Sequence, residues 1–323
     1  MTSNTPTPNR WHQNRWIGHG LYLLIMAVLI GGIYMSGQRI NYSWHWERLY
    51  PFIIDTTPVD ILADADGTAV LSATGELSIV PDNGDEPQLV PHYDTALVMD
   101  GDLVFQGNTV AQLEHWRFGP IAEGLWVTIK ISVVSLVFAI VLGVVFGLMR
   151  ISEVVVLRDL AITYIELIRG TPLLVQIFIV YFFIGTVFQL DQFTAAVAAL
   201  AIFTGAYVAE IVRAGIQSIP VGQMEAARSL GMNYVQAMYY VIMPQAIQRT
   251  LPPLAGQFIN LIKDSSLVSV ISITDLSKAG REVISGSFAP FEVWFTVALL
   301  YLLITGLLSL LTQRLEKRMA ANV

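Results

Sequence analysis

Charged side chains inside otherwise apolar stretches are the first feature of this sequence that could do chemistry. The set is Glu166, Arg169, Glu210, Lys263 and Asp264, with the hydroxyl of Ser265 beside them. A charge in a nonpolar setting is costly, so it usually faces a protein interior or a water-filled path, or pairs with an opposite charge. A lining of both signs suits a solute that itself carries both. Mutual pairing, Arg169 with Glu166 and Lys263 with Asp264, stays open as the alternative.

The three residues after Arg169 add a break to the chain. Gly170, Thr171 and Pro172 interrupt an apolar helical pattern, and the interruption frees backbone N–H and C=O groups. Such groups are tolerated within a membrane mainly beside protein or water. The segment is therefore predicted to form a kink, and a gate or solute contact remains open.

Other kinds of chemistry have no support. The chain has no cysteine, which excludes disulfides and thiolate metal ligands. Its five histidines never fall at metal-ligand spacing, and no nucleophile–base pair stands out, so we expect neither a metal site nor a catalytic residue. No lysine follows a glycine, so the Gly-Lys-Ser/Thr end of a phosphate-binding loop is absent.

Composition points to lipid as the solvent that surrounds these residues. Of the 323 positions, 54% are hydrophobic and 13% charged, about half the charged fraction of a soluble domain. A membrane-crossing helix needs about 20 mainly apolar residues. Six segments qualify, and the fifth is the weakest because Lys263 and Asp264 lie inside it: Trp16–Met35, Leu125–Met149, Leu173–Val187, Phe193–Ile216, Leu254–Ile273 and Val293–Thr312.

The distribution of positive charge predicts the orientation. With a cytoplasmic N-terminus, ten Lys and Arg residues fall in inside segments and five in outside segments. The positive-inside rule therefore favours both termini in the cytoplasm. A cleaved signal peptide is the alternative for the first span, but no Ala-x-Ala-like site follows Gly32, so an uncleaved anchor is preferred.

A long acidic segment separates the first two spans. Between Gly37 and Gly119 there are thirteen acidic and three basic residues, and Leu77–Val80 and Leu103–Phe105 are strand-like runs between turn signals. We predict an all-α polytopic membrane protein of about six transmembrane helices with a small β-rich periplasmic insertion. Its parts are a cytoplasmic N-terminus (1–15), a transmembrane helix (16–36), the insertion (37–118) and a five-helix core (119–323). A spacer or docking surface is the preferred role of the insertion.

The loop between the fourth and fifth spans, residues 217–245, reads as helix, turn, helix. Pro220 suits a helix start, and Gly231 suits the left-handed residue that follows a helix. Asn233 with Gln236 can form a capping box, and Pro244 is expected to end the second helix. Small alanines and an apolar stripe suit insertion into a groove on a partner protein. An interfacial helix on lipid is the alternative, although Arg228 alone would attract headgroups and Glu225 opposes it.

This loop resembles the EAA motif of permease subunits of ABC importers. The matching residues are Glu225-Ala226-Ala227, Gly231 and the end Val241-Ile242-Met243-Pro244, where Val and Met replace the Ile and Leu of the motif. The resemblance implies that Glu225, Ala226, Ala227 and Gly231 belong to coupling helices of this chain that dock into a separate ATPase subunit. Met224 and Arg228 are expected as further contacts.

Four further blocks resemble the polar amino acid permeases for histidine, glutamine, arginine and glutamate. They begin at Gly124, Tyr164, Ala206 and Asn260, and the resemblance runs from about Gly119 to the C-terminus. It implies ABC ATPase subunits that hold the ATP and Mg, a second permease copy or paralogue, and a periplasmic amino-acid-binding protein. The expected setting is the lipid of a bacterial inner membrane, without nucleic acid and without a cofactor on this chain.

Two other classes of function remain as alternatives. An ion-gradient-driven secondary transporter would explain the charges inside the spans but not the loop around Glu225. A membrane-anchored sensor would need fewer spans, and no kinase-like or DNA-binding domain is present in the sequence.

Overall fold

The computed structural model describes residues 15–39, 42–72 and 75–320, and it divides into two compact units, Met1–Trp46 and Glu47–Val323. The first unit contains helix α1 (Arg15–Arg39), which is apolar and long enough to cross a membrane from Gly18 onward. Its later residues form an aromatic cluster in which Trp44 stacks on Trp46 at 5.8 Å between ring centroids.

The second unit opens with two short turns, η2 (Trp46–Leu49) and α2 (Tyr50–Ile53). Leu49 is buried there against apolar side chains from three later helices, among them Ile121, Leu276 and Val293. A two-stranded ribbon follows, in which β1 (Ile54–Asp55) pairs with β9 (Arg117–Phe118). The ribbon brings together the two ends of the segment 56–116.

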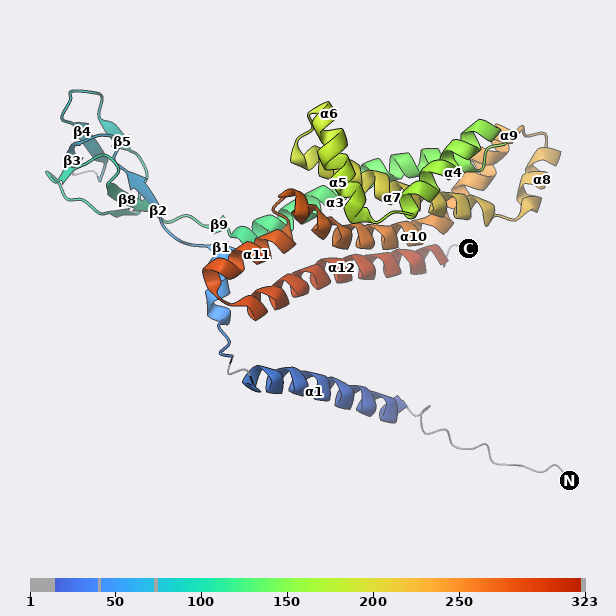
Figure 1. The fold of residues 1–323 in the computed structure, drawn as a ribbon, viewed down its shortest axis with the longest axis horizontal. Helices are drawn as coiled ribbons and strands as arrows, with labels where there is room; N and C mark the ends of the chain where they lie inside the picture. Colours follow the sequence, from blue (N-terminus) through green and yellow to red (C-terminus); the bar gives the residue numbers. More distant parts are fainter. Residues whose placement is uncertain (1–14, 40–41, 73–74, 321–323) are drawn as a thin grey trace. The chain divides into compact units, whose positions relative to one another are not determined.

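Residues 56–116 form two antiparallel sheets around one small core (Figure 1). One sheet has the order β5-β4-β3-β7 and the other the order β2-β8-β6. The strands are β2 (Val59–Leu62), β3 (Gly67–Leu71), β4 (Leu77–Pro81), β5 (Gln88–Val90), β6 (Thr95–Ala96), β7 (Leu103–Val104) and β8 (Thr109–Leu113). Leu77, Ile79 and Val110 are nearly inaccessible in the core. The predicted run Leu77–Val80 lies in β4, and the run Leu103–Phe105 lies in β7 except for Phe105.

Close packing of α3 (Pro120–Arg150) against α7 (Gln192–Gln217) organises the helical part. Small residues recur along the buried side of α3, which lets the two backbones approach as in other membrane helix pairs. A Cβ on Gly143 would lie 2.3 Å from Val208, and one on Gly147 would lie 2.8 Å from the carbonyl of Ala209. Any larger residue at either position would force the helices apart.

The other helical elements follow in chain order. Between α3 and α7 lie α4 (Val155–Arg169), α5 (Leu173–Phe178), the π-helical turn η3 (Ile179–Gly185) and α6 (Thr186–Phe188). After α7 come α8 (Val221–Ser229), α9 (Tyr234–Ala237), the π-helical turn η4 (Met238–Ile242), α10 (Met243–Asp264), the 3₁₀ turn η5 (Ser265–Ile271), α11 (Leu276–Ser287) and α12 (Pro290–Ala320).

Four helices are long and apolar enough to cross a membrane, and a bent pair brings the number to five within the described residues. They are α1, α3, α7, α12 and the pair α4 with α5 to α6, which is bent by 107°. The segment Leu254–Ile273, predicted as the fifth span, is not one apolar helix. The α-helix ends at Asp264 and the 3₁₀ turn η5 follows, so the apolar run is divided between two elements.

Candidate functional site

The loop of residues 217–245 joins α7 to α10 through a sharp turn after α8. Gly231 has φ +89°, its N–H donates to the carbonyl of Arg228, and the N–H of Met232 donates to the carbonyl of Ala227. This pair of bonds is the Schellman arrangement, which satisfies carbonyls left free at a helix end and needs a left-handed residue. The prediction for Gly231 is confirmed, and no atom beyond its chain neighbours lies within 4 Å of a Cβ placed there.

The next helix begins with the predicted capping box. The side chain of Asn233 accepts from the N–H of Gln236 at 2.9 Å, and the amide of Gln236 accepts from the N–H of Asn233 at 3.0 Å. Two backbone donors that a helix start would leave free are thereby paired. The loop is therefore held by local interactions at both sides of its turn.

Pro244 does not end the second helix, contrary to the prediction. The chain passes from α9 into the π-helical turn η4 and continues into α10, with Pro244 in the first turn of α10. Within this continuous helical path Pro244 has no N–H to give to a carbonyl of the preceding turn. The widened turn before it lets the helical path continue.

The side chains of α8 divide into two sets. Ala227 is buried, and Met224 is half-buried beside Ile216 and Ile242 in a cluster at the end of α7, so its expected contact with a partner stays a prediction. Glu225, Ala226 and Arg228 are exposed. Large apolar side chains are also exposed along the loop, namely Val221, Leu230, Tyr234, Val235, Tyr239 and Tyr240. An exposed apolar surface of this kind is typical of a binding site for another protein.

The base of the loop is tied to the start of α10. Arg249 donates to the carbonyl of Ser218 at 2.6 Å and to its hydroxyl at 3.2 Å. A movement of the loop would therefore be transmitted directly to α10.

Two of the predicted charged residues join a cluster that the sequence did not indicate. Arg150, the last residue of α3, lies 3.6 Å from Glu166 of α4 and 3.6 Å from Glu210 of α7. Arg213 pairs with Glu210 one turn further along α7 and also donates to Gln217. The cluster links three helices at the end of α7 from which the loop emerges.

Arg169 is not in this cluster. Its guanidinium lies over the ring of Tyr207, 5.4 Å from the ring centroid. Within the described residues, the ion pair of Glu166 is with Arg150 and not with Arg169. An exposed arginine on an aromatic face keeps its charge available while the ring contributes a cation–π attraction.

The break after Arg169 is held by Gln176. Its amide nitrogen contacts the carbonyl of Ile168 at 2.7 Å, the carbonyl of Thr171 at 3.1 Å and the hydroxyl of Thr171 at 2.7 Å. The hydroxyl of Thr171 donates in turn to the carbonyl of Leu167. Carbonyls left free by the bend between Gly170 and Pro172 therefore find donors inside the protein, as a nonpolar setting requires.

The remaining predicted residues lie at the end of α10. Ser265 is fully buried and donates to the carbonyl of Ile262 at 2.8 Å, which is a local structural bond. Lys263 is exposed and Asp264 is half-buried. Among the described residues, no ion pair joins these two side chains to the cluster around Arg150.

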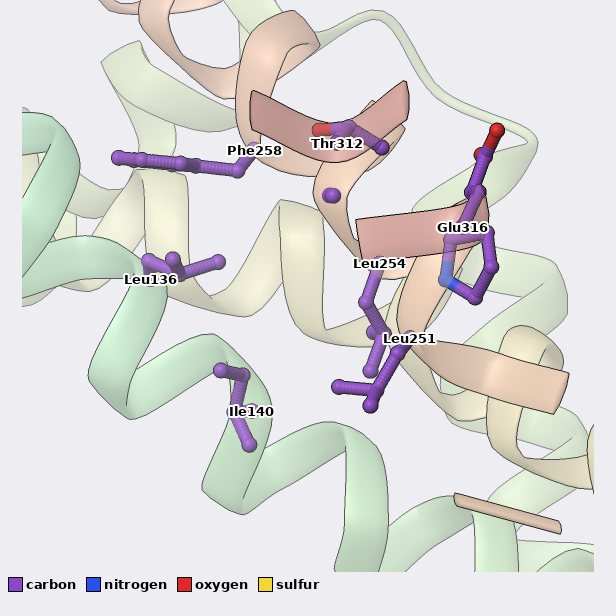
Figure 2. Close-up of a pocket in the computed structure, with 9 residues that line it drawn as sticks. Leu136, Ile140, Leu251, Leu254, Phe258, Thr312 and Glu316 are labelled. Atoms are coloured by element: carbon purple, nitrogen blue, oxygen red, sulfur yellow. The ribbon is translucent and has the colours of Figure 1, made fainter. Parts of the chain in front are cut away.

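A pocket of about 260 Å³ lies between α3, α10 and α12. Figure 2 shows Leu136 and Ile140 of α3 facing Leu251 and Leu254 of α10, with Glu316 at one side. The lining is almost entirely hydrocarbon, and none of the predicted charged residues contributes to it. Such a pocket suits an apolar group and not a zwitterion.

Arg150, Gln176 and Asp275 are functional candidates that sequence reasoning missed. The sequence indicated Arg150 only as one of the positive charges on the inside. Gln176 lies in the block that begins at Tyr164, and no role was predicted for it. Asp275 is fully buried and caps α11 by accepting from the N–H groups of Ser277 and Lys278, and Tyr301 donates to it. An Asp followed by a helical pattern was the one available signal for that cap.

Comparison with known proteins places these features in a wider set. Residues 139–321 match the family described as "Binding-protein-dependent transport system inner membrane component". The glutamine transport system permease protein GlnP of Escherichia coli (strain K12) is 42% identical over 200 residues, covering 61% of this chain and 91% of that protein. The L-cystine transport system permease protein TcyB of Bacillus subtilis (strain 168) is 40% identical over 210 residues, covering 64% and 90%.

Solved structures give the same result. The chain resembles one described as a crystal structure of an amino acid ABC transporter with histidines, with a TM-score of 0.58 and 42% identity over 62% of this chain and 94% of the other. The fold is also that of a chain of the MetNI methionine ABC transporter, at a TM-score of 0.54 and 20% identity.

Proposed function

This chain belongs to the family of binding-protein-dependent transport system inner membrane components, and from that premise we propose how its residues serve transport. It is the membrane permease subunit of an ABC importer for amino acids. An ion-gradient-driven transporter is not favoured. The proposal concerns the substrate, the coupling to ATP and the part played by each side chain.

The substrate is a polar amino acid. Relatives at 37–42% identity are named for glutamine, L-cystine and arginine, which share the α-ammonium and α-carboxylate groups and differ in their side chains. Recognition of the shared part asks for charged or strongly polar groups on the path. Arg169 is the best candidate for the α-carboxylate, because it is exposed and stacked on Tyr207 instead of being neutralised in an ion pair.

The loop of residues 217–245 couples transport to a separate ATPase subunit that holds ATP and Mg. The observation that carries this proposal is the exposed apolar surface of the loop, from Val221 to Tyr240, on a turn that local bonds hold in shape. Glu225, Ala226 and Arg228 face outward with this surface and are its polar contacts. Ala227 and the half-buried Met224 hold α8 against the permease itself, and both position the surface that the ATPase contacts, with Met224 as a further contact.

Movement of the loop reaches the membrane helices along two routes. One route is the bond from Ser218 to Arg249, at the start of α10. The other is the chain of polar contacts from Gln217 through Arg213 and Glu210 to Arg150. Glu166 continues this chain to the last turn of α4, directly before the break at Gly170, Thr171 and Pro172. Glu166 and Glu210 therefore act in positioning helices, and Lys263 and Asp264 remain candidates for the path.

Six crossings, with both termini in the cytoplasm, complete the proposed topology. The α10 helix with the η5 turn serves as the remaining crossing, with the exposed Lys263 and the half-buried Asp264 turned towards the path and not towards lipid. Two permease copies, or this chain with a similar permease, enclose the path, and a periplasmic binding protein delivers the amino acid.

Co-purification tests the proposed function. The tagged protein is expressed from its own operon in a gentle detergent, and the proteins retained with it are identified. We expect an ATPase subunit that is lost when Glu225 and the exposed Leu230 are replaced by Lys and Ser. A control variant, Leu157→Ser on α4, alters an apolar side chain outside the loop and retains the subunit. Absence of any ATPase, under conditions that preserve a related importer, would contradict the proposal.

A further inference from the structure

The outer face of the four-stranded sheet is exposed, apolar and without charge. On its inner face Ala69, Ile79 and Val104 are buried in the core. Because side chains alternate along a strand, the residues next to such buried ones in each strand point to the outer face of the sheet. Four of these are exposed to between 40% and 74%, namely Val70, Val80, Leu89 and Leu103. We call these four residues the apolar face.

Strand register brings the members of the apolar face together. Leu103, Thr68 and Val80 are opposite one another across β7, β3 and β4. Val70, Ser78 and Leu89 form the next row across β3, β4 and β5. The two rows are adjacent, and they contain no ionisable side chain. Leu89 and Leu103 lie on the two edge strands, β5 and β7, and the two valines lie on the strands between them. Exposed apolar surface of this kind is typical of a protein-binding site.

The charge around this face selects what can cover it. Residues 56–116 contain eleven Asp and Glu residues and neither Lys nor Arg. A second copy of the same domain would bring equal negative charge to the contact, and anionic lipid headgroups would be repelled for the same reason. A partner with an apolar patch inside a positively charged rim meets both the face and its surroundings.

We propose that the apolar face binds the soluble substrate-binding protein of this importer, through an apolar patch with a basic rim on that protein. The proposal rests on the proposed function, which requires such a partner on the side of the membrane where this domain lies. The β1–β9 ribbon joins the domain to α2 and to the start of α3, and a Cβ on Gly119 would lie 2.4 Å from the backbone of Phe52. A bound partner would therefore be held at the entrance of α3.

Two pairs of matched substitutions test the proposal. The intact importer, reconstituted in nanodiscs with its ATPase, is titrated with the purified binding protein from the same operon. Leu89→Thr with Leu103→Thr alters the apolar face and keeps a residue suited to strands. Leu62→Thr with Leu97→Thr makes the same change at leucines 48% and 51% exposed in the other part of the domain. We expect about tenfold weaker binding for the first pair and wild-type binding for the second.

The dependence on salt provides a second readout. Because the attraction is between opposite charges, affinity of the wild type should fall several-fold as ionic strength rises from about 0.05 to about 0.5 M. If the binding protein bound both double variants with equal affinity, the proposal would be overturned. It would also be overturned if the variant Leu89→Thr with Leu103→Thr lost self-association of the importer while the other double variant kept it. Retention of the ATPase in the same preparation separates these outcomes from a failure of the proposed function. Should the first pair lower the protease resistance of the domain, Leu103→Thr alone replaces it.

Discussion

Gly231 and Arg150 show how differently two single residues can be predicted. Gly231 follows a run of good helix formers and precedes a capping residue, so its left-handed conformation depends only on neighbours in the sequence. The partners of Arg150 are 16 and 60 positions away, and no local pattern indicates them. Ion pairs between helices depend on tertiary packing, which explains why Arg169, and not Arg150, was the alternative partner considered for Glu166.

Substitutions of Gly231 should show whether strain in the turn weakens ATPase binding without lowering the amount of protein in the membrane. Gly231→Val forces a β-branched residue into a left-handed conformation, which costs about 1–2 kcal/mol and favours a different turn. We expect membrane-inserted protein with little ATPase bound and little uptake. Gly231→Asn tolerates the conformation and should retain most of both. Immunoblots of membranes and ATPase co-purification measure the two effects, and equal uptake by both variants would contradict the prediction.

The two carboxylates around Arg150 should differ in importance. The Glu210 side chain is 23% exposed and contacts both Arg150 and Arg213, whereas that of Glu166 is 63% exposed and contacts Arg150 at 3.6 Å. Exposed pairs contribute little. Glu210→Gln should therefore lower the Tm of the purified protein by several degrees, and Glu166→Gln by about 1 degree at most. A larger fall for Glu166→Gln would assign that residue a further contact.

Among helices and strands, the residues that begin or end an element determined what could be predicted. Strands β4 and β7, the turn after α8 and the start of α9 are each bounded by local signals and were predicted correctly. Pro244 and the pair Pro252–Pro253 are equally strong signals, yet the helical path continues through them. A widened turn before the first proline, and neighbouring helices around the others, supply what the backbone loses.

The start of α11 should respond to pH through its buried cap. Burial raises the pKa of Asp275, so its folded state favours the protonated form, and this contribution to stability is lost as the pH rises through the raised pKa. Asp275→Asn keeps an acceptor for the cap and removes the titration. As the pH rises from near the ordinary aspartate pKa of 3.8 through the raised pKa, the Tm of Asp275→Asn relative to wild type should therefore rise.

A second variant checks the cap itself. Asp275→Ala leaves two helix-start donors unpaired and should be less stable than Asp275→Asn by about 1–2 kcal/mol at every pH, because neither variant titrates at this position. A Tm difference between Asp275→Asn and wild type that does not change with pH would contradict the role of burial.

For the whole molecule, composition predicted the membrane setting and the separate acidic segment, because both follow from averages over many residues. It did not predict the number of continuous apolar helices, since a bend of 107° and internal prolines are local features. The neighbouring ends of β1 and β9 lead to one more expectation. Replacing residues 57–115 with Asn-Gly should join the two strands through a two-residue turn and leave the helices folded.

Uptake by that shortened protein tests the domain as a unit. We expect retention of the ATPase and of membrane insertion, together with a several-fold higher binding-protein concentration for half-maximal uptake. An unchanged concentration would mean that the domain contributes nothing to delivery of the amino acid. Failure of the shortened protein to reach the membrane would mean that the helices depend on the domain for folding.

The absence of Lys and Arg from residues 56–116 has a consequence for proteolysis. Trypsin cuts after these two residue types, and the sites that flank the domain are Arg48 and Arg117. Trypsin added to cells without an outer membrane should release the domain as one uncut peptide of residues 49–117. The same peptide would appear only after lysis if the domain faced the cytoplasm.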